Sequence, residues 1–398
     1  MKKSLHHFYT ENDIKKEYTF WKTQLVPQFH ENPPINLGPI KSEFKDEEIN
    51  KYPIELPEKD MEWVLIDITK EGELEKIYNF LNEYYYEVEE YKENYSPEFL
   101  KWQLSPIKNN PHKNILLSIQ INKKIIAFFS GLPLKLSVYG KEIITYNISF
   151  LCVDINYRHK KLAEYMFREM FRRTYLENVF QNIFVSRLLI PKPFAESTYY
   201  YTDVEETIKK FIKRKKYNNN NFRLMEKKDV KSVCKLISED QKKFKIYSIF
   251  NEDEIEHWFI PIKDVIYSFV KEDNNGNITD FTSFYITNSL FEGNKEKWCY
   301  IYFNIASSMS SEELFINSLI LANKSGINCY ICNSINNYEY LCKKYNFESN
   351  IEDECSYGSL KYYFNNFICP ETEGKERYIS YIDINIIILL CLYIYNII

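Results

Sequence analysis

Two stretches of this chain begin alike, and this repeated order constrains the fold more than any other feature. Residues 63–85 and 222–244 each have the pattern of a short strand followed by a helix with apolar residues at positions i, i+3 and i+4. The stretch KRKKYNNNNF at 213–222 lies between them, and it is charged, then low in complexity, with nothing to bury. The sequence therefore predicts two similar halves, residues 1–215 and 222–382.

Strand patterns follow the opening helix in both halves. Residues 114–140 are typical of a hairpin with its turn at 122–124, and residues 264–287 of a hairpin that turns across NNGN. Residues 310–326 predict a helix with Ser310 or Ser311 at its N-cap and Gly326 just after its end. Mostly antiparallel strands flanked by helices favour an α+β fold over a strict βαβ alternation.

Charge and cysteine content limit the class of protein. The net charge is -5, from 51 basic and 56 acidic residues, which argues against nucleic acid as the main partner. The nine cysteines are scattered at irregular spacings, with no paired CxxC motifs and no His pairs at metal-ligand spacing. Neither a disulfide framework nor a zinc site is therefore expected, and we predict a reducing, cytoplasmic location. The first residues have no apolar signal core and do not begin Met-Gly, so neither a secretory leader nor N-myristoylation of the chain itself is expected.

The final residues differ from the rest of the chain. Residues 384–398, INIIILLCLYIYNII, are almost entirely apolar, but a membrane span needs about 20 residues. The segment has three interpretations: a short tail anchor, a buried terminal strand or helix, or a sequence that is not native to the fold.

A cationic cluster lies between a predicted strand and a predicted helix. The stretch YNISFLCVDINYRHKKLAEYMF, residues 146–167, contains Arg158, His159, Lys160 and Lys161 at this junction. Because a helix N-terminus already carries free N–H groups and partial positive charge, added cations are unfavourable there unless an anion binds. The pattern suggests a phosphate or pyrophosphate site, with a solvated charged turn as the alternative.

The same stretch resembles known acyltransferases. In CoA-dependent enzymes of the acetyltransferase-like superfamily a splayed strand feeds a turn that wraps the pyrophosphate, and Arg158, Lys161 and Ala163 occupy the positions of that motif. SFLCV at 149–153 and RHKKLA at 158–163 are similar to the N-myristoyltransferase signature. Further segments have counterparts in the same order: 20–29, 94–104, 190–193, 256–259, 275–285 and 358–370.

The resemblance covers residues 18–370, and the chain is identified as a divergent member of the N-myristoyltransferase family. It implies an α+β fold in which two pseudo-symmetric, acetyltransferase-like (GNAT-like) halves form one saddle-shaped sheet flanked by helices. The first half would bind acyl-CoA and the second would bind the peptide, with residues 383–398 as an extension of uncertain status.

The resemblance also implies an acyl-CoA site. Its residues would line the pocket, pass along the thioester and hold the CoA phosphates; in chain order they are Thr19, Phe20, Trp21, Phe150, Leu151, Cys152, Val153, Arg158, His159, Lys160, Lys161, Leu162 and Ala163. The backbone N–H groups of Phe150 and Leu151 would form an oxyanion hole for the thioester carbonyl. A tryptophan near an N-terminus is otherwise usually a core residue, so Trp21 has that second interpretation.

For the acceptor peptide, the implied contacts lie elsewhere in the sequence. Tyr85, Tyr199 and Ser289 match family positions that contact the peptide, whereas Tyr201 stands where the family usually has His and Ser334 where it has Asp. The acidic segment at 84–93 lies where the family has a loop that faces basic residues of the substrate, with Glu89 and Glu90 as the closest equivalents. As a charge run alone it would be a solvated loop.

The general base is the main departure from the family. There the chain's own terminal carboxylate takes the proton of the substrate amine, and its counterpart would fall near residues 381–382. Because the chain continues, three outcomes stay open: the Ile398 carboxylate substitutes, the Asp383 side chain serves, or the chain is catalytically impaired.

Other departures also lie around the chemistry. Val185 aligns with a common Thr, Ser149 with a common Asn, and residues 350–357 replace a Gly-rich approach to the final conserved segment.

Three functional hypotheses follow. The first is a cytoplasmic, monomeric N-myristoyltransferase that moves a myristoyl group from myristoyl-CoA to the N-terminal glycine amine of a protein or peptide, by direct attack and without a metal. The second is an impaired paralogue that binds acyl-CoA or acylated peptide, and the third is an acyltransferase with another acyl length. Association with membranes or ribosomes stays open.

Overall fold

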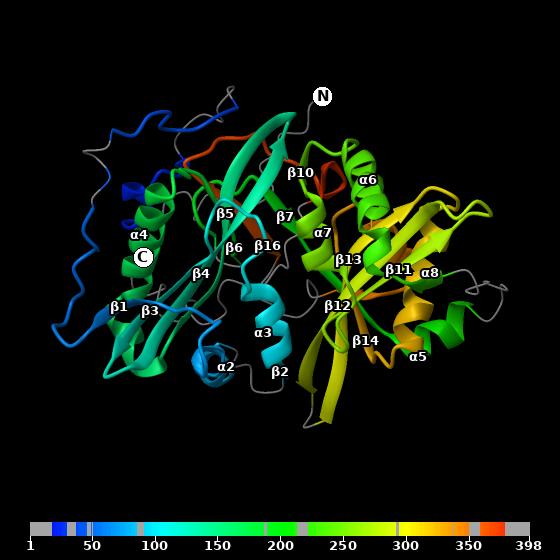
Figure 1. Cartoon of the computed structure of the whole chain (residues 1–398), viewed down its shortest axis with the longest axis horizontal. Helices are drawn as coiled ribbons and strands as arrows, with labels where there is room; N and C mark the ends of the chain where they lie inside the picture. Colours follow the sequence, from blue (N-terminus) through cyan, green and yellow to red (C-terminus); the bar gives the residue numbers. More distant parts are fainter. Residues whose placement is uncertain are drawn as a thin grey trace.

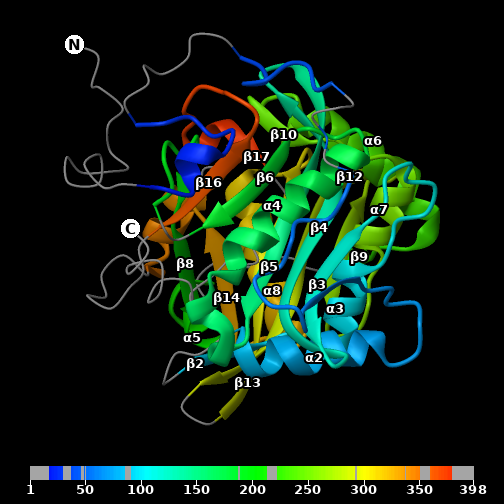
Figure 2. The same cartoon turned by 90° about the vertical axis from the view of Figure 1, so that its left-hand side faces the viewer.

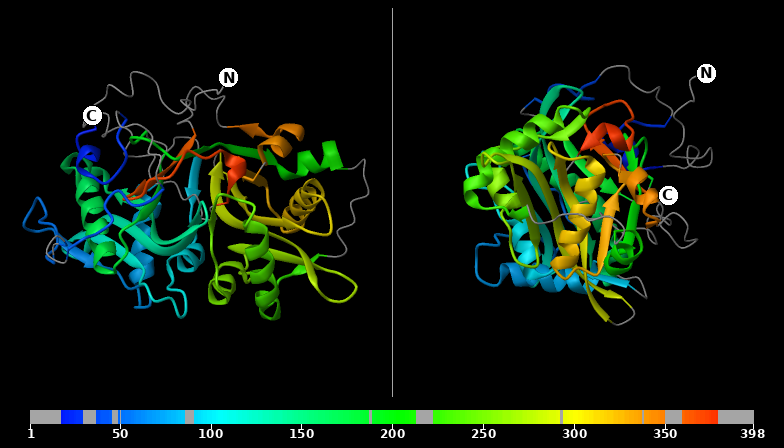
Figure 3. Two further views of the ribbon diagram at one scale, coloured as in Figure 1. Left: turned by 90° about the horizontal axis from the view of Figure 1, so that it is seen from above. Right: turned by 90° about the vertical axis from the view of Figure 1, so that its right-hand side faces the viewer.

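The strands of the chain form two sheets that lie side by side along the long axis of the molecule, with helices packed on their faces (Figures 1 and 3). The structure is a computed structural model. It describes residues 18–29, 37–45, 49, 51–85, 91–186, 189–212, 222–291, 294–336, 338–349 and 359–378.

The first sheet has nine strands within these residues. Its order is β1 (Glu62–Leu65), β3 (Ile115–Ile121), β4 (Lys124–Val138), β5 (Lys141–Val153), β6 (Asn182–Ser186), β16 (Leu360–Asn365) and β7 (Ala195–Ser197), with β10 (Ile246–Ser248) paired to β4 and to β17 (Arg377–Tyr378). The β5–β6 and β10–β17 pairs are parallel, and the remaining pairs are antiparallel.

The second sheet has eight strands in the described chain. Its order is β15 (Glu348–Ser349), β8 (Tyr199–Asp203), β14 (Cys329–Asn333), β13 (Asn294–Ala306), β12 (Ile278–Phe291), β11 (Ile266–Glu272) and β9 (Phe222–Leu224), with β2 (Tyr91–Asn94) paired to β12. The β13–β14 pair is parallel.

The predicted α+β class is confirmed, and hydrogen bonding divides the strands of the saddle-shaped sheet implied by the resemblance into two sheets. The chain leaves the first sheet at β7 and enters the second at β8, and Thr198 between them donates its backbone N–H to Ser334 Oγ at 2.9 Å. Thr198 lies outside both ladders, and no strand of the first sheet pairs with a strand of the second sheet in the described chain. The division near residues 215–222 stays a prediction, and strands from both sides of it contribute to both sheets.

The helices are α2 (Glu73–Tyr84), α3 (Pro97–Leu104), α4 (Leu162–Leu176), α5 (Val204–Thr207), α6 (Val230–Gln241), α7 (Glu252–Phe259), α8 (Ser311–Lys324) and α9 (Tyr338–Lys344). Short 3-10 turns are η1 (Trp21–Thr23), η2 (Ile155–Lys160), η4 (Lys227–Asp229) and η5 (Gly374–Glu376), and η3 (Ile208–Ile212) is a π turn. Helix α4 lies across the first sheet (Figure 2), where Met166, Phe167 and Met170 enter the core.

Local signals in the sequence gave the hairpins and caps correctly. Asn122 and Lys123 have φ of 48° and 66°, the left-handed pair that a two-residue turn between β3 and β4 requires. Ser310 Oγ accepts the backbone N–H of Glu313, and Gly326 after the end of α8 has φ of 75°. Among the described residues, no helix is long and apolar enough to cross a membrane.

Candidate acyl-CoA and peptide site

A β-bulge interrupts β5 at the predicted oxyanion residues. Phe128 pairs with Cys152 and Ser130 with Ser149, so one residue of β4 faces two residues of β5, Phe150 and Leu151. Phe150 has φ of 58°, in a left-handed region that aromatic residues rarely adopt. A bulge leaves its extra residue outside the ladder and redirects the backbone, so hydrogen-bonding groups become available there.

Both bulge residues are buried, and a pair of hydroxyls holds the strand beside them. Phe150 is 0% exposed and Leu151 is 3% exposed. The Ser130 hydroxyl donates to the backbone oxygen of Ser149 at 2.9 Å, and the two serine hydroxyls lie 2.9 Å apart. The Ser149 side chain therefore supports the start of the bulge.

The cationic cluster lies between β5 and α4, as predicted, but in a turn of its own. Asp154 accepts the backbone N–H of Asn156 at 3.0 Å and so caps η2. Lys161 then has φ of 56° and ends this turn, and α4 begins at Leu162. The strand, turn and helix N-terminus thus form one continuous path from the bulge to the cations.

The four residues of the cluster differ in their contacts. Arg158 donates to two main-chain oxygens, from Nε to Val153 at 3.1 Å and from Nη2 to Tyr84 at 3.2 Å. Lys160 forms an ion pair with Glu58.

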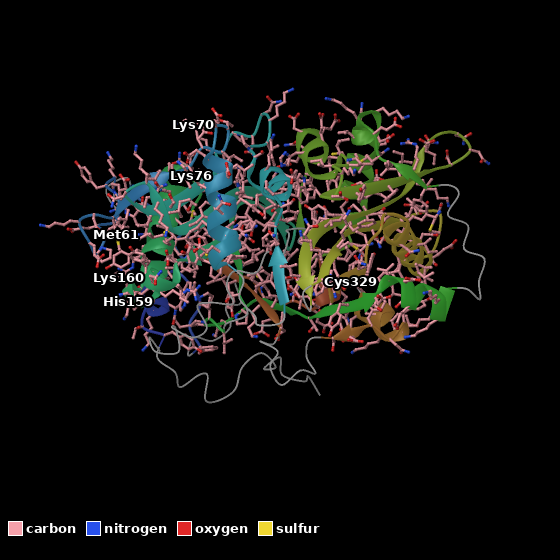
Figure 4. All side chains as sticks on the ribbon, turned by 90° about the horizontal axis from the view of Figure 1, so that it is seen from below. Met61, Lys70, Lys76, His159, Lys160 and Cys329 are labelled. Carbon is pink, nitrogen blue, oxygen red and sulfur yellow. The ribbon has the colours of Figure 1, made fainter. Side chains whose placement is uncertain are left out.

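The side chains of His159 and Lys161 are exposed, and neither has a partner in the described part of the chain. Figure 4 shows His159 and Lys160 on the side of the molecule that also carries Met61. The backbone N–H of Met61 donates to the backbone oxygen of Glu58 at 3.2 Å. Within the predicted phosphate-binding cluster, His159 and Lys161 are thus the two residues that face solvent without a partner in the described chain.

The predicted N-terminal residues lie beside α4. Trp21 stacks on Phe184 with ring centroids 5.7 Å apart and meets Phe167 edge-on at 5.1 Å. Phe20 is also buried, whereas Thr19 is exposed. Trp21 is therefore a core residue in this structure, whatever its contribution to an acyl pocket.

The predicted peptide contacts that the structure describes lie at the end of α2 and on the second sheet. Tyr85 is buried at the end of α2, with its ring 5.7 Å from Phe150. Tyr199 and Tyr201 pair with Asn333 and Ile331, so they lie on one face of the second sheet. Ser289 on β12 is 2% exposed, and Ser334 follows β14. Glu89 and Glu90 lie outside the described residues.

Aromatic rings connect the two sides of the site, a feature that the sequence analysis missed. Consecutive rings from the bulge to the second sheet are 5.0 to 6.0 Å apart, in the order Phe150, Tyr95, Phe99, Tyr285, Tyr300 and Tyr199. Tyrosine is so frequent in this chain, with 34 residues, that no local pattern distinguished these rings.

Burial makes a cysteine nucleophile unfavourable on the peptide side. Cys329 pairs with Asp203 at the end of β8 and is labelled in Figure 4. Burial raises the pKa of its thiol to about 12, so it stays protonated at neutral pH. In the described chain, no group of three or more His, Cys, Asp or Glu side chains is placed to hold a metal ion.

The predicted base residues are not located. Asp383, Ile398 and residues 381–382 all lie outside the described residues. Val185 is buried in β6 and pairs with Tyr362 in β16, so an apolar side chain takes the position where the family commonly has Thr.

Comparison with known proteins gives the class of this fold and site. The sequence matches the family description myristoyl-CoA:protein N-myristoyltransferase over residues 39–197 for the N-terminal domain and 196–386 for the C-terminal domain. The two matches meet beside Thr198, where the chain passes from the first sheet to the second.

Individual relatives agree with this match. The chain is 30% identical to glycylpeptide N-tetradecanoyltransferase of Plasmodium falciparum, over 92% of this chain and 94% of that protein. It is 31% identical to the protein of that name from Dictyostelium discoideum, over 91% and 92%. A crystal structure of Saccharomyces cerevisiae N-myristoyltransferase with bound myristoyl-CoA superposes with a TM-score of 0.79 at 24% identity, over 90% of this chain and 94% of that one.

The fold and the matched sequence are thus those of an acyltransferase. The chain belongs to the myristoyl-CoA:protein N-myristoyltransferase family.

Proposed function

We propose that this chain transfers a myristoyl group from myristoyl-CoA to the amine of an N-terminal glycine. The observation that carries the proposal is the β-bulge at Phe150–Leu151, which leads within eight residues into a cationic turn at the N-terminus of α4. A thioester carbonyl at the bulge would have its CoA phosphates within reach of that turn. The names of the relatives support the identity of the acyl group and the acceptor.

The proposed chemistry is a direct transfer. The glycine amine attacks the thioester carbonyl, a C–N bond forms, the C–S bond breaks, and CoA leaves as the thiol after it gains a proton. Backbone N–H groups of Phe150 and Leu151 would stabilise the oxyanion, a role worth about 3–4 kcal/mol for a single donor. The base that accepts the amine proton is left unassigned, because both predicted candidates lie outside the described residues.

The acceptor would lie along the connected aromatic rings. Tyr85 beside the bulge and Tyr199 on the second sheet mark two ends of this path, and Tyr201, Ser289 and Ser334 lie on the elements around its far end. Glu89 and Glu90 stay predictions for basic residues of the peptide. A cytoplasmic location and a monomeric state also stay predictions.

A second candidate is a paralogue that binds acyl-CoA but turns over slowly. Val185 at a common Thr position favours it, because a buried valine offers no hydroxyl for proton transfer.

Two measurements on the full chain separate these candidates. Calorimetry with a non-hydrolysable myristoyl-CoA analogue reports binding, and thiol detection of CoA release with a Gly-peptide reports turnover, with an N-acetylated peptide as the control. We expect binding together with release that needs the free amine. Binding without release would support the paralogue, and tighter binding of acetyl-CoA would support another acyl length.

A further inference from the structure

The contacts of Arg158 differ from those expected of a residue that binds a phosphate. Both of its hydrogen bonds go to main-chain oxygens, those of Val153 at the end of β5 and of Tyr84 at the end of α2. The guanidinium therefore bridges the end of a strand and the end of a helix. A cation whose donors are already directed at two oxygens in this way is not free to bind a phosphate with the same groups.

The contact with Tyr84 is favourable because of where that oxygen lies. Tyr84 is the last residue of α2, and the last carbonyls of a helix have no intrahelical partner and carry its partial negative charge. The final turn of α2 contains no basic residue of its own. Arg158, 74 positions later in the chain, supplies the missing cation.

The segment fixed by this contact leads directly to the acceptor side of the site. Tyr85 follows at once, and its ring lies 5.7 Å from Phe150 and 6.1 Å from Tyr95. The chain then reaches β2, which pairs with β12 so that Glu93 lies opposite Ser289. The position of Tyr84 thus fixes the position of Tyr85, the first residue of the proposed peptide path.

We propose that Arg158 is a positioning residue: it holds the end of α2 and Tyr85 against the bulge, and in this way it positions the acceptor peptide. Phosphate binding then depends on the exposed His159 and Lys161, and on Lys160 once it leaves Glu58. This inference rests on the proposed function and assigns Arg158 a role different from the one expected from the family resemblance.

The test compares R158A with K161A, a matched loss of one cation from the same turn. Each variant is measured for the dissociation constant of the non-hydrolysable myristoyl-CoA analogue and for the peptide KM in CoA release. Loss of a charge-assisted hydrogen bond typically changes an equilibrium constant by about tenfold. We expect R158A to raise the peptide KM about tenfold and the analogue dissociation constant less than threefold, and K161A to show the reverse.

Two further readouts keep the test decisive. Hydrogen exchange of the free protein at amides 82–85 should accelerate in R158A and stay unchanged in K161A, a result that needs no catalysis. R158K should fall between wild type and R158A, because an ammonium cannot span both carbonyl oxygens as a guanidinium does.

The proposal is overturned if R158A weakens analogue binding as much as K161A and leaves the peptide KM and the exchange rates unchanged. If wild type neither binds the analogue nor releases CoA, the proposed function fails, and the exchange comparison still decides whether Arg158 holds α2.

Discussion

Because the backbone at Phe150 is left-handed, we predict that glycine is better tolerated than alanine at this position. Phe150 is fully buried, so removal of its ring should cost about 3–5 kcal/mol in either variant. An L-residue in this conformation costs about 1–2 kcal/mol, which alanine retains and glycine avoids. Glycine loses about 0.5–1 kcal/mol relative to alanine through backbone entropy. F150G should therefore be as stable as F150A or more stable, by up to about 1.5 kcal/mol.

Phe184 is the matched control. It is also fully buried, but it lies in β6, where it is paired with both Ile148 and Tyr363 and is not among the residues with positive φ. At this position the usual order should hold, with F184G about 0.5–1 kcal/mol less stable than F184A. The difference between the two comparisons isolates the backbone contribution and should be about 1–2 kcal/mol.

Urea unfolding at 25 °C is the appropriate assay. An unfolding entropy of about 2.1 cal/mol/K per residue gives about 0.8 kcal/mol/K for 398 residues, so the whole contrast is only about 1–2 °C in Tm. If alanine exceeds glycine at position 150 by the same margin as at position 184, Phe150 is not held in a left-handed conformation, and the bulge as described is wrong.

Three further predictions concern other sites. Glu169 is fully buried and binds Arg172 at 2.7 Å, so E169Q should lower the free energy of unfolding by about 3–5 kcal/mol in urea, and removal of Arg172 as well should recover part of the loss. Burial lowers the pKa of His257, although its ring also lies 2.9 Å from the Trp102 oxygen. Because the unfolded chain binds the proton more readily, stability should fall as pH drops from about 7 to 5, and H257Q should flatten this slope in thermal melts. An amide-to-ester replacement that removes the Leu151 N–H should reduce kcat about 100- to 1,000-fold with little change in analogue binding; an unchanged kcat would exclude this N–H from the oxyanion hole.

Local sequence signals predicted the parts of the fold that depend on neighbouring residues. The turn at Asn122–Lys123 and the Ser310 cap each follow from side chains or backbone angles within four residues, so they were accessible from the sequence. The junction of strand, cations and helix was predicted for the same reason. Its assignment to acyl-CoA binding rests on the family resemblance and stays a prediction.

Features that depend on distant residues were not predictable in this way. Nothing in SFLCV marks Phe150 as left-handed, because the bulge results from the register that β5 adopts on β4. The Arg158 contact with Tyr84 spans 74 positions, and the cluster had suggested a phosphate ligand instead. The division into two sheets depends on the strand with which β8 pairs. This partner, β14, lies more than a hundred residues later in the chain.

The exchange of strands between the halves has a consequence for biosynthesis. The antiparallel neighbour of β6 is β16, at residues 360–365. The neighbours of β8 are β14 and β15, which are also synthesised much later than β8. While the ribosome is still translating the intervening residues, both strands expose edges that are able to pair with another nascent chain. Neither sheet is completed before the last part of the chain emerges, so a fragment that ends near residue 215 should aggregate, whereas the two fragments expressed together should be able to assemble.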